Sequence, residues 1–311
     1  MRVRAVALAV AVAVVLPVAA GDLAGANGRT PLPGPLAVAP QPSETAPASE
    51  LTPTFEDQVI VLVNQERWAH GQLPPLSRCA LLDVASETHS TNMASRDFFA
   101  HCDPDTHTLP WDRMVAAGYA WSSVGENIAA GYSTPAAVMA GWMASAGHRA
   151  NILSTGFREI GVGYAHDPGD LADVRLDQNG DCIPDAVGGP YVHYWTQSFG
   201  RRTEVYPVVI DREACQTDTV TVDLYLYGAG WADEMRIRNS GGAWTAWQPF
   251  AADVSWQLAP GPGVRQVNVE VRSGATVRSA SDTIVSTAAG DIVFADGFES
   301  GGTGAWSSAV P

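Results

Sequence analysis

The sequence predicts two folded domains in one chain: an α+β domain, followed by an all-β domain of about 85 residues. Before residue 200 the apolar residues repeat with helical spacing in four segments and alternate with polar residues in two others. After residue 204 only strand patterns occur, separated at short intervals by Gly, Pro and Asn. All seven histidines lie between His70 and His193, so any imidazole chemistry belongs to the first domain.

Composition narrows the classes of protein and of partner. The chain has 311 residues, of which 46% are hydrophobic and 16% charged, and this excludes a disordered or fibrous protein. Its net charge of -15 argues against nucleic acid as a partner, because phosphate binding needs a surplus of cations. All 18 basic residues are arginine, which excludes mechanisms that need a lysine Schiff base.

The amino terminus predicts export. Residues 1–20 contain two arginines, an apolar run from Ala5 to Leu16 and then small residues, as a secretory signal peptide does. The run is shorter than the roughly 20 residues that span a bilayer, and we expect no transmembrane segment after signal cleavage. Residues 21–50 are rich in Ala and Pro and are expected to be a disordered linker. The predicted location is secreted, extracellular or periplasmic.

The first domain, expected over residues 51–203, has helical and strand signals in a definite order. Thr54 is a plausible N-cap of the first helix, and Pro135 stands in the first turn of the fourth. Helices on either side of a small sheet fit an α+β layer arrangement. The predicted elements are helices 54–71, 79–96 and 110–118, a helix that starts after Thr134, and strands 159–164 and 191–199.

The second domain, expected over residues 204–288, reads as a β-sandwich. Its Trp244, Trp247 and Trp256 either form an exposed surface for stacking carbohydrate or pack in the core, and we favour the core. Residues 289–311 are Gly-rich and acidic, and we expect a loosely held tail.

Three polar stretches of the first domain are candidates for a cleft. They are FFAHCDPDT with His101, VGENIAAG with Glu126 and Asn127, and GWMASAGHRANIL with Ser145 and His148. If these stretches are loops that converge, two imidazoles and a carboxylate share one cleft, which can hold a divalent metal or act as acid and base. The gaps of 25 and 22 residues match no short zinc motif.

Other interpretations of the same residues stay open. His101, Glu126 and His148 can equally form a hydrogen-bonded network that holds three loops together. Ser145 can pair with His148 as a nucleophile, but a helix-capping role is favoured because no G-x-S-x-G motif surrounds it. Gln197 lies on a strand face that either lines the cleft or belongs to the core.

A second candidate site lies in the segment LDQNGDCIPDA. Its oxygen-bearing side chains alternate as in calcium loops of the EF-hand and thrombospondin type, and we predict weak calcium binding there. Cys182 replaces the turn glycine and Gly188 replaces the bidentate Glu, so a solvated acidic turn is the alternative. The four candidate side-chain ligands are Asp177, Asn179, Asp181 and Asp185.

The four cysteines would form up to two disulfides in an exported protein. Cys79 and Cys102 flank a predicted helix that would hold them roughly 25 Å apart, so this pair is disfavoured. Among the remaining pairings we favour Cys102 with Cys182.

The motifs FFAH, GENIAAG, GHRANIL, IGVGY and YWTQSFG occur here in the order found in the bacterial branch of the CAP superfamily, which the region from Phe55 to Gly200 resembles. That superfamily includes cysteine-rich secretory proteins and plant pathogenesis-related proteins. The resemblance implies an α-β-α sandwich with a central cleft. It places the family's two cleft histidines on His101 and His148 and its first cleft glutamate on Glu126, while the second glutamate falls on Ser145.

The resemblance implies a function in binding more than in catalysis, since members are mostly secreted and are proposed to bind sterols, lipids or divalent metals. The second domain resembles an immunoglobulin-like module of bacterial secreted proteins. We therefore expect a non-enzymatic binding protein whose cleft takes zinc on His101 and His148, or a small ligand such as a lipid. One rival is a zinc-dependent hydrolase in which Glu126 activates water and Glu126 and His148 are catalytic. The other is an adhesion protein that recognises a cell-surface component through its β module.

Overall fold

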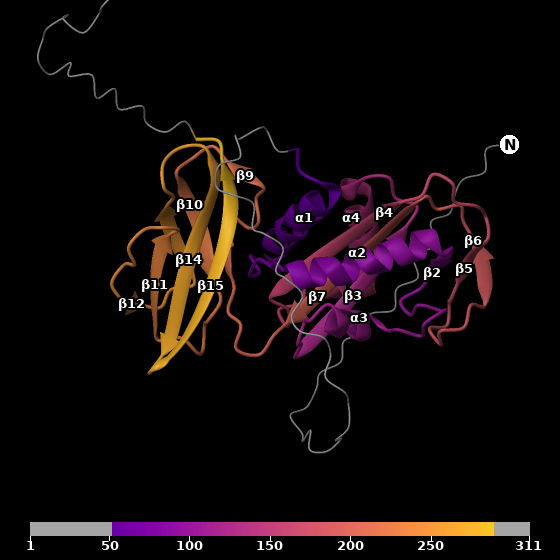
Figure 1. Cartoon of the computed structure of the whole chain (residues 1–311), viewed down its shortest axis with the longest axis horizontal. Helices are drawn as coiled ribbons and strands as arrows, with labels where there is room; N and C mark the ends of the chain where they lie inside the picture. The colour runs from indigo at the N-terminus through magenta and orange to yellow at the C-terminus, as the bar shows by residue number, and fades with distance from the viewer. Residues whose placement is uncertain (1–51, 289–311) are drawn as a thin grey trace, which may run out of the picture.

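The computed structural model describes residues 52–288 of the chain. The predicted signal peptide, linker and tail lie outside the described residues. Figure 1 shows a mixed α/β part and, beside it, a part built of strands alone, coloured orange to yellow. The predicted order of a mixed domain before an all-β domain is confirmed in this coarse form.

Five helices form in the first domain. Thr54 caps the first of them with a capping box, because its hydroxyl accepts from the Asp57 amide and the Asp57 carboxylate accepts from the Thr54 amide. Pro110 and Pro135 each stand in the first turn of a helix, as predicted. The helices are α1 (Phe55–Ala69), α2 (Ala80–Ser95), α3 (Pro110–Ala116), α4 (Pro135–Ala144) and α5 (Ala146–Ile152).

The main sheet of this domain has four strands in the order β1-β4-β7-β3. The β7 strand pairs antiparallel with both β4 and β3, so β3 lies at one edge of the sheet. A second, three-stranded sheet has the order β2-β5-β6. Their bounds are β1 (Ser77–Arg78), β2 (Phe98–Phe99), β3 (Ser123–Ala130), β4 (Glu159–His166), β5 (Val174–Leu176), β6 (Ala186–Gly188) and β7 (His193–Arg201).

Alternation along the strands places helices on opposite faces of the main sheet. Ile160 and Val162 of β4 pack in one buried cluster with apolar residues of α1 and α4. Gly161 and Gly163, between and beside them, face α2, where an added Cβ would lie 2.1 Å and 2.3 Å from its backbone. The two glycines therefore allow α2 to approach the sheet more closely than any side chain would permit.

The motif VGENIAAG corrects a prediction, since it forms strand β3 and not a loop. Seven of its eight residues are buried, so apolar and polar residues do not alternate as they would on a half-exposed strand. The polar Glu126 and Asn127 inside the strand made the segment look like a turn. The GHRANIL segment is likewise the short helix α5, not a loop.

The β module, residues 204–288, contains two sheets, of three strands (β13-β10-β8) and five strands (β12-β11-β14-β15-β9). Residues from both sheets share one aliphatic core, while an immunoglobulin-like arrangement stays a prediction. The strands are β8 (Val208–Ile210), β9 (Gln216–Thr217), β10 (Thr221–Leu226), β11 (Glu234–Asn239), β12 (Gln248–Pro249), β13 (Asp253–Gln257), β14 (Gly263–Ser273) and β15 (Thr276–Ser286).

Trp244 and Trp247 of this module lie outside its core, contrary to the prediction, whereas Trp256 packs against the core. Trp244 and Trp247 are half-buried, and both stack against arginine guanidinium groups. Arg236 lies between them, 4.9 Å from one ring centroid and 4.7 Å from the other. The aromatic rings are thus covered by cations instead of by aliphatic side chains.

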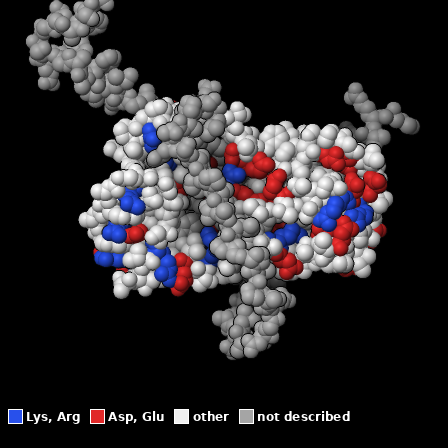
Figure 2. Space-filling model, viewed as in Figure 1, with Lys and Arg blue, Asp and Glu red and all other residues white. Residues whose placement is uncertain are grey.

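The two domains contact one another directly. The Asn64 side chain of α1 donates to the Arg212 carbonyl at 3.1 Å, and the Tyr227 hydroxyl donates to the Pro75 carbonyl at 3.0 Å. The Arg212 guanidinium also lies 3.8 Å above the ring of Trp68. On the face shown in Figure 2, basic and acidic side chains are interspersed and no extended basic area is visible.

Helices of the described part are too short or too polar to cross a bilayer.

Candidate functional site

The candidate site lies at the β3 edge of the main sheet. His101 follows β2, Glu126 lies in β3, and His148 lies in α5, which packs beside β3. Because β3 is paired on one side only, groups from the α2 and α5 layers can approach each other around its open edge. The structure therefore brings the three segments of the predicted cleft together.

Glu126 is held by two basic partners. Its Oε1 lies 2.8 Å from His101 Nδ1, and its Oε2 accepts from Arg113 Nη2 at 2.7 Å. Burial alone would raise the pKa of Glu126, but the Arg113 charge, helped by nearby histidines, lowers it to about 2. The carboxylate is ionised at every physiological pH.

The ionised Glu126 fixes the tautomer of His101. A carboxylate can only accept hydrogen bonds, so the Nδ1 of His101 must carry the proton. The Nε2 atom then carries a lone pair, and it is buried without a hydrogen-bond partner. A carboxylate on one ring nitrogen that leaves the other free is the usual arrangement of a metal-binding histidine.

His148 is the most isolated polar group of the site. It is 2% exposed, and neither of its ring nitrogens has a hydrogen-bond partner. Burial, and secondarily the charge of His101, lowers its pKa to about 4. The ring is therefore neutral at pH 7.

Buried amides connect His148 to the sheet. Asn127 Nδ2 donates to the His148 carbonyl at 3.2 Å and to Gln197 Oε1 at 3.0 Å. Asn151 Nδ2 donates to Asn127 Oδ1 at 2.9 Å. Gln197 Nε2 and Asn151 Oδ1 are left without partners. Asn127 thus supports the backbone that carries His148, and Gln197 is bonded to Asn127.

The predicted capping role of Ser145 needs correction, and a further histidine, His89, contacts the segment before His101. Ser145 occupies the N-cap position of α5, as favoured, but its hydroxyl makes no capping hydrogen bond. His89 of α2 is fully buried. Its Nε2 donates to the Ala100 carbonyl at 2.9 Å, because a carbonyl can only accept. This contact holds the segment that precedes His101 against α2.

The disulfide Cys102–Cys182 forms, as favoured from the sequence. Cys79 and Cys215 remain thiols, so the second disulfide is absent from the described part of the chain. Within residues 52–288, one group of three His, Cys, Asp or Glu side chains has its potential metal-ligand atoms within 4.8 Å of one another. It consists of Cys102, His107 and Cys182. The disulfide occupies both sulfurs, so this group offers no metal site in its oxidised form.

The Asp-rich segment forms a tight loop between β5 and β6. Asp177 Oδ1 accepts from the Gly180 and Asp181 amides, and its Oδ2 accepts from the Cys182 amide. Asp185 Oδ1 accepts from the Gln178 amide. The loop carboxylates thus bond to their own backbone, and calcium binding by Asp177, Asn179, Asp181 and Asp185 stays a prediction.

Four residues at or beside the site were not singled out in the sequence. Arg113 neutralises Glu126 from α3, and its Nη2 also donates to the His101 carbonyl at 3.0 Å. Asn151 lies three residues after His148 in α5 and donates to the Glu126 carbonyl. The rings of Phe99 and Trp111 line a cavity beside the site. The lone Arg in the short helix 110–116 is the one signal that pointed to a partner for a buried acid.

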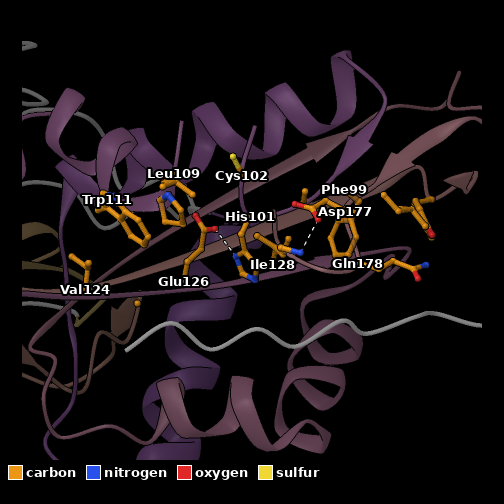
Figure 3. A pocket seen from close by; sticks show the side chains of 16 residues that line it. Phe99, His101, Cys102, Leu109, Trp111, Val124, Glu126, Ile128, Asp177 and Gln178 are labelled. Atoms are coloured by element: carbon orange, nitrogen blue, oxygen red, sulfur yellow. Dashed lines mark hydrogen bonds and ion pairs between the residues drawn. The ribbon is translucent and has the colours of Figure 1, made fainter. Parts of the chain in front are cut away.

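The cavity has a volume of about 150 Å³ and lies next to His101 and Glu126 (Figure 3). Most of its lining is apolar, and residues of β3, the start of α3 and the Asp-rich loop contribute to it. His148 is not among the residues that line the cavity.

Comparison with known proteins shows which family the first domain is similar to. Residues 60–199 match the model of the Cysteine-rich secretory protein family, CAP. The chain is 38% identical over 128 residues to "Uncharacterized protein YkwD" of Bacillus subtilis, covering 41% of this chain and 49% of that protein. It is 32% identical over 110 residues to "Uncharacterized membrane protein YlbC" of the same organism, covering 35% and 31%.

Among solved structures, an extracellular protein containing a SCP domain from Bacillus anthracis is similar with 28% identity and a TM-score of 0.37. The match covers 48% of this chain and 40% of that one. The chain spans about half the length of the first curated relative and about a third of the second. Residues 60–199 of this chain therefore belong to the bacterial CAP superfamily, the cysteine-rich secretory protein family.

Proposed function

We propose that the protein is an exported binding protein whose CAP domain holds a divalent metal ion, zinc in the first instance, between His101 and His148. The observation that carries the proposal is the set of three imidazole nitrogens, His101 Nε2 and both nitrogens of His148, that are buried without any partner. Leaving buried polar groups unpaired costs about 1–3 kcal/mol each. A ligand that pairs with them would offset that cost.

The chemistry of the donors suits zinc. Metal-binding imidazoles must be neutral, and the lowered pKa of His148, about 4, keeps it so at pH 5 and above. Glu126 orients His101 and keeps the Nε2 lone pair free. When bound, zinc would act as a Lewis acid at a site with open coordination positions. Two protein ligands instead of the usual three or four favour modest affinity.

The same geometry favours binding over hydrolysis. A general base works best with a pKa near the operating pH, whereas the pKa of Glu126 is about 2. Both of its oxygens are already bonded, to His101 and to Arg113. Glu126 is therefore a weak candidate for activating water, and its role in this proposal is to orient His101.

The proposal that the protein is exported is supported by observations other than the metal site. The predicted signal peptide and the Cys102–Cys182 disulfide both fit a protein that works outside the cytoplasm, because disulfides persist in oxidising compartments. Under this proposal the partner is a small molecule or a cell-surface component that meets the metal site from outside the cell.

Equilibrium dialysis against zinc tests the proposal. We expect one zinc ion per wild-type chain, and at least a hundredfold loss of affinity in His148→Ala. His70→Ala is the matched control, since the His70 side chain is 47% exposed and lies in neither the cleft nor its network. Zinc binding that is equal in wild type and His148→Ala would contradict the proposal.

A further inference from the structure

We infer that the cavity beside His101 is a binding pocket for a compact apolar group of benzene or toluene size. The inference deepens the proposed function, since His101 of the proposed metal site and Glu126, which orients it, also line this cavity, but it is argued from the apolar lining residues. It also narrows the predicted ligand, because a pocket of this size does not accept a whole lipid.

The lining explains the preference for apolar ligands. Phe99 and Trp111 contribute aromatic rings from two sides, and Val124 and Ile128 of β3 form the floor (Figure 3). Leu109 closes the end next to α3. An apolar, concave surface with few polar groups is the common form of a small-molecule site.

The two carboxylates that line the cavity, Glu126 and Asp177, are already bonded within the protein. Both oxygens of Glu126 take hydrogen bonds from His101 and Arg113. Both oxygens of Asp177 take backbone amides of its own loop. Neither carboxylate needs a polar ligand to satisfy it, so removal of apolar surface from water drives binding.

Volume sets the size of the ligand. The cavity measures about 150 Å³, and an apolar cavity of about that volume in a protein core stays dry and binds benzene. A group of about six to ten non-hydrogen atoms therefore fills it. A sterol or a long acyl chain exceeds this volume and would have to leave most of its apolar surface outside.

The Asp-rich loop gives the cavity its fixed volume. Asp177, Gln178 and Gly180 form one wall, which faces the segment that carries His101. The disulfide between Cys102 and Cys182 joins that wall to the residue next to His101. A tethered wall is pre-organised, which lowers the entropy lost when a ligand binds.

Calorimetric titration of the full chain with toluene tests the inference. We expect saturable binding to one site, and at least a tenfold weaker affinity in Leu109→Phe, whose larger side chain fills the cavity. Val115→Phe is the matched control, because Val115 lies in α3, the helix that begins directly after Leu109, but is 59% exposed and does not line the cavity. It should bind toluene as the wild type does.

Two further measurements keep the test decisive. If Leu109→Phe fails to fold, a size series in wild-type protein takes its place, in which toluene binds and palmitate does not displace it. His148→Ala should still bind toluene, since His148 does not line the cavity, so failure of the metal proposal is seen separately. No toluene binding, undiminished binding in Leu109→Phe, or displacement by palmitate overturns the inference.

Discussion

The two domains of this chain bury very different material. Of the 17 polar or charged residues that are buried in residues 52–288, only Ser286 belongs to the β module. The module's core is made of aliphatic side chains and one methionine. The CAP domain, in contrast, buries a guanidinium group, a carboxylate and an imidazole near the edge strand β3. They belong to Arg113, Glu126 and His148.

The two domains also differ in how many of their buried polar atoms lack a hydrogen-bond partner. Eleven buried side-chain nitrogen and oxygen atoms of the described residues lack a hydrogen-bond partner, and six belong to the CAP site. Those six lie on His89, His101, His148, Asn151 and Gln197. Buried polar groups are normally paired, and the β module holds three of the eleven exceptions, on Arg238, Arg265 and Ser286. The CAP site is therefore where the proposed ligand would find the most buried polar atoms without a partner.

The largest expected effect comes from Arg113→Met. Removing this guanidinium leaves the Glu126 charge buried with only the imidazole of His101 as a partner, and losing one member of a buried ion pair costs about 3–5 kcal/mol. Arg278→Met in the β module breaks an exposed pair with Glu204 and should cost less than about 1 kcal/mol. Guanidinium chloride unfolding measures both. Equal losses in the two variants would remove the contrast between the domains.

Lowering the pH should reduce the free energy of unfolding by a smaller amount, because His89 is protonated in the unfolded chain but not in the folded chain. Burial, and then the charge of Arg113, lowers its pKa to about 3, well below the ordinary value of 6.5. The unfolded chain thus binds this proton between pH 6.5 and 3 while the folded chain does not, so stability is full above pH 6.5 and falls as pH drops. The loss between pH 7 and pH 4.5 is about 2–3 kcal/mol.

His89→Gln removes this titration and should flatten the decline in unfolding free energy by that amount. His70→Gln, on the exposed end of α1, should leave the wild-type curve unchanged. A curve for His89→Gln that is as steep as the wild-type curve would show that His89 is already protonated in the folded protein.

The outer face of the β module should respond more weakly still. Trp244 stacks on Arg236 and Arg238, and each such contact contributes about 0.5–1 kcal/mol at a partly exposed position. Trp244→Ala should therefore lower the unfolding free energy by about 1–2 kcal/mol and leave zinc binding unchanged. A loss above about 3 kcal/mol would mean that this tryptophan behaves as a core residue after all.

Calcium should give the smallest shift. If the Asp-rich loop binds calcium in the roughly millimolar range, a few-fold excess over Kd stabilises the protein by about 1 kcal/mol. That corresponds to a rise in Tm of about 2–4 °C for a chain of this size. Asp181→Ala should abolish the rise. The same rise in both proteins would identify the loop as an ordinary acidic turn.

Local signals in the sequence predicted much of the fold. Thr54 with Asp57, and Pro135 after Thr134, set helix starts through hydrogen bonds and backbone geometry within a few residues. Strand β3 was missed because burial on both faces removes the alternation by which a strand is recognised. Trp247 was misplaced because sequence does not show that Arg272 of a distant strand covers its ring.

The site was predictable as a set of residues but not as an arrangement. His101, Glu126 and His148 follow from motif order, yet the tautomer of His101 depends on the ionisation of Glu126. That ionisation depends on Arg113, whose approach is set by the packing of α3 and not by any spacing in the sequence. The lowered pKa of His148 likewise results from burial, which only the folded chain reveals.

The central claim is that the imidazoles of His101 and His148 receive one metal ion, and histidine side-chain nitrogen NMR tests it most directly. One equivalent of zinc added to protein with ¹⁵N-labelled histidine should shift the Nε2 resonance of His101 and one ring nitrogen of His148. The exposed His70, His107 and His166 should not respond. Shifts confined to those three exposed histidines, with His101 and His148 unchanged, would contradict the account.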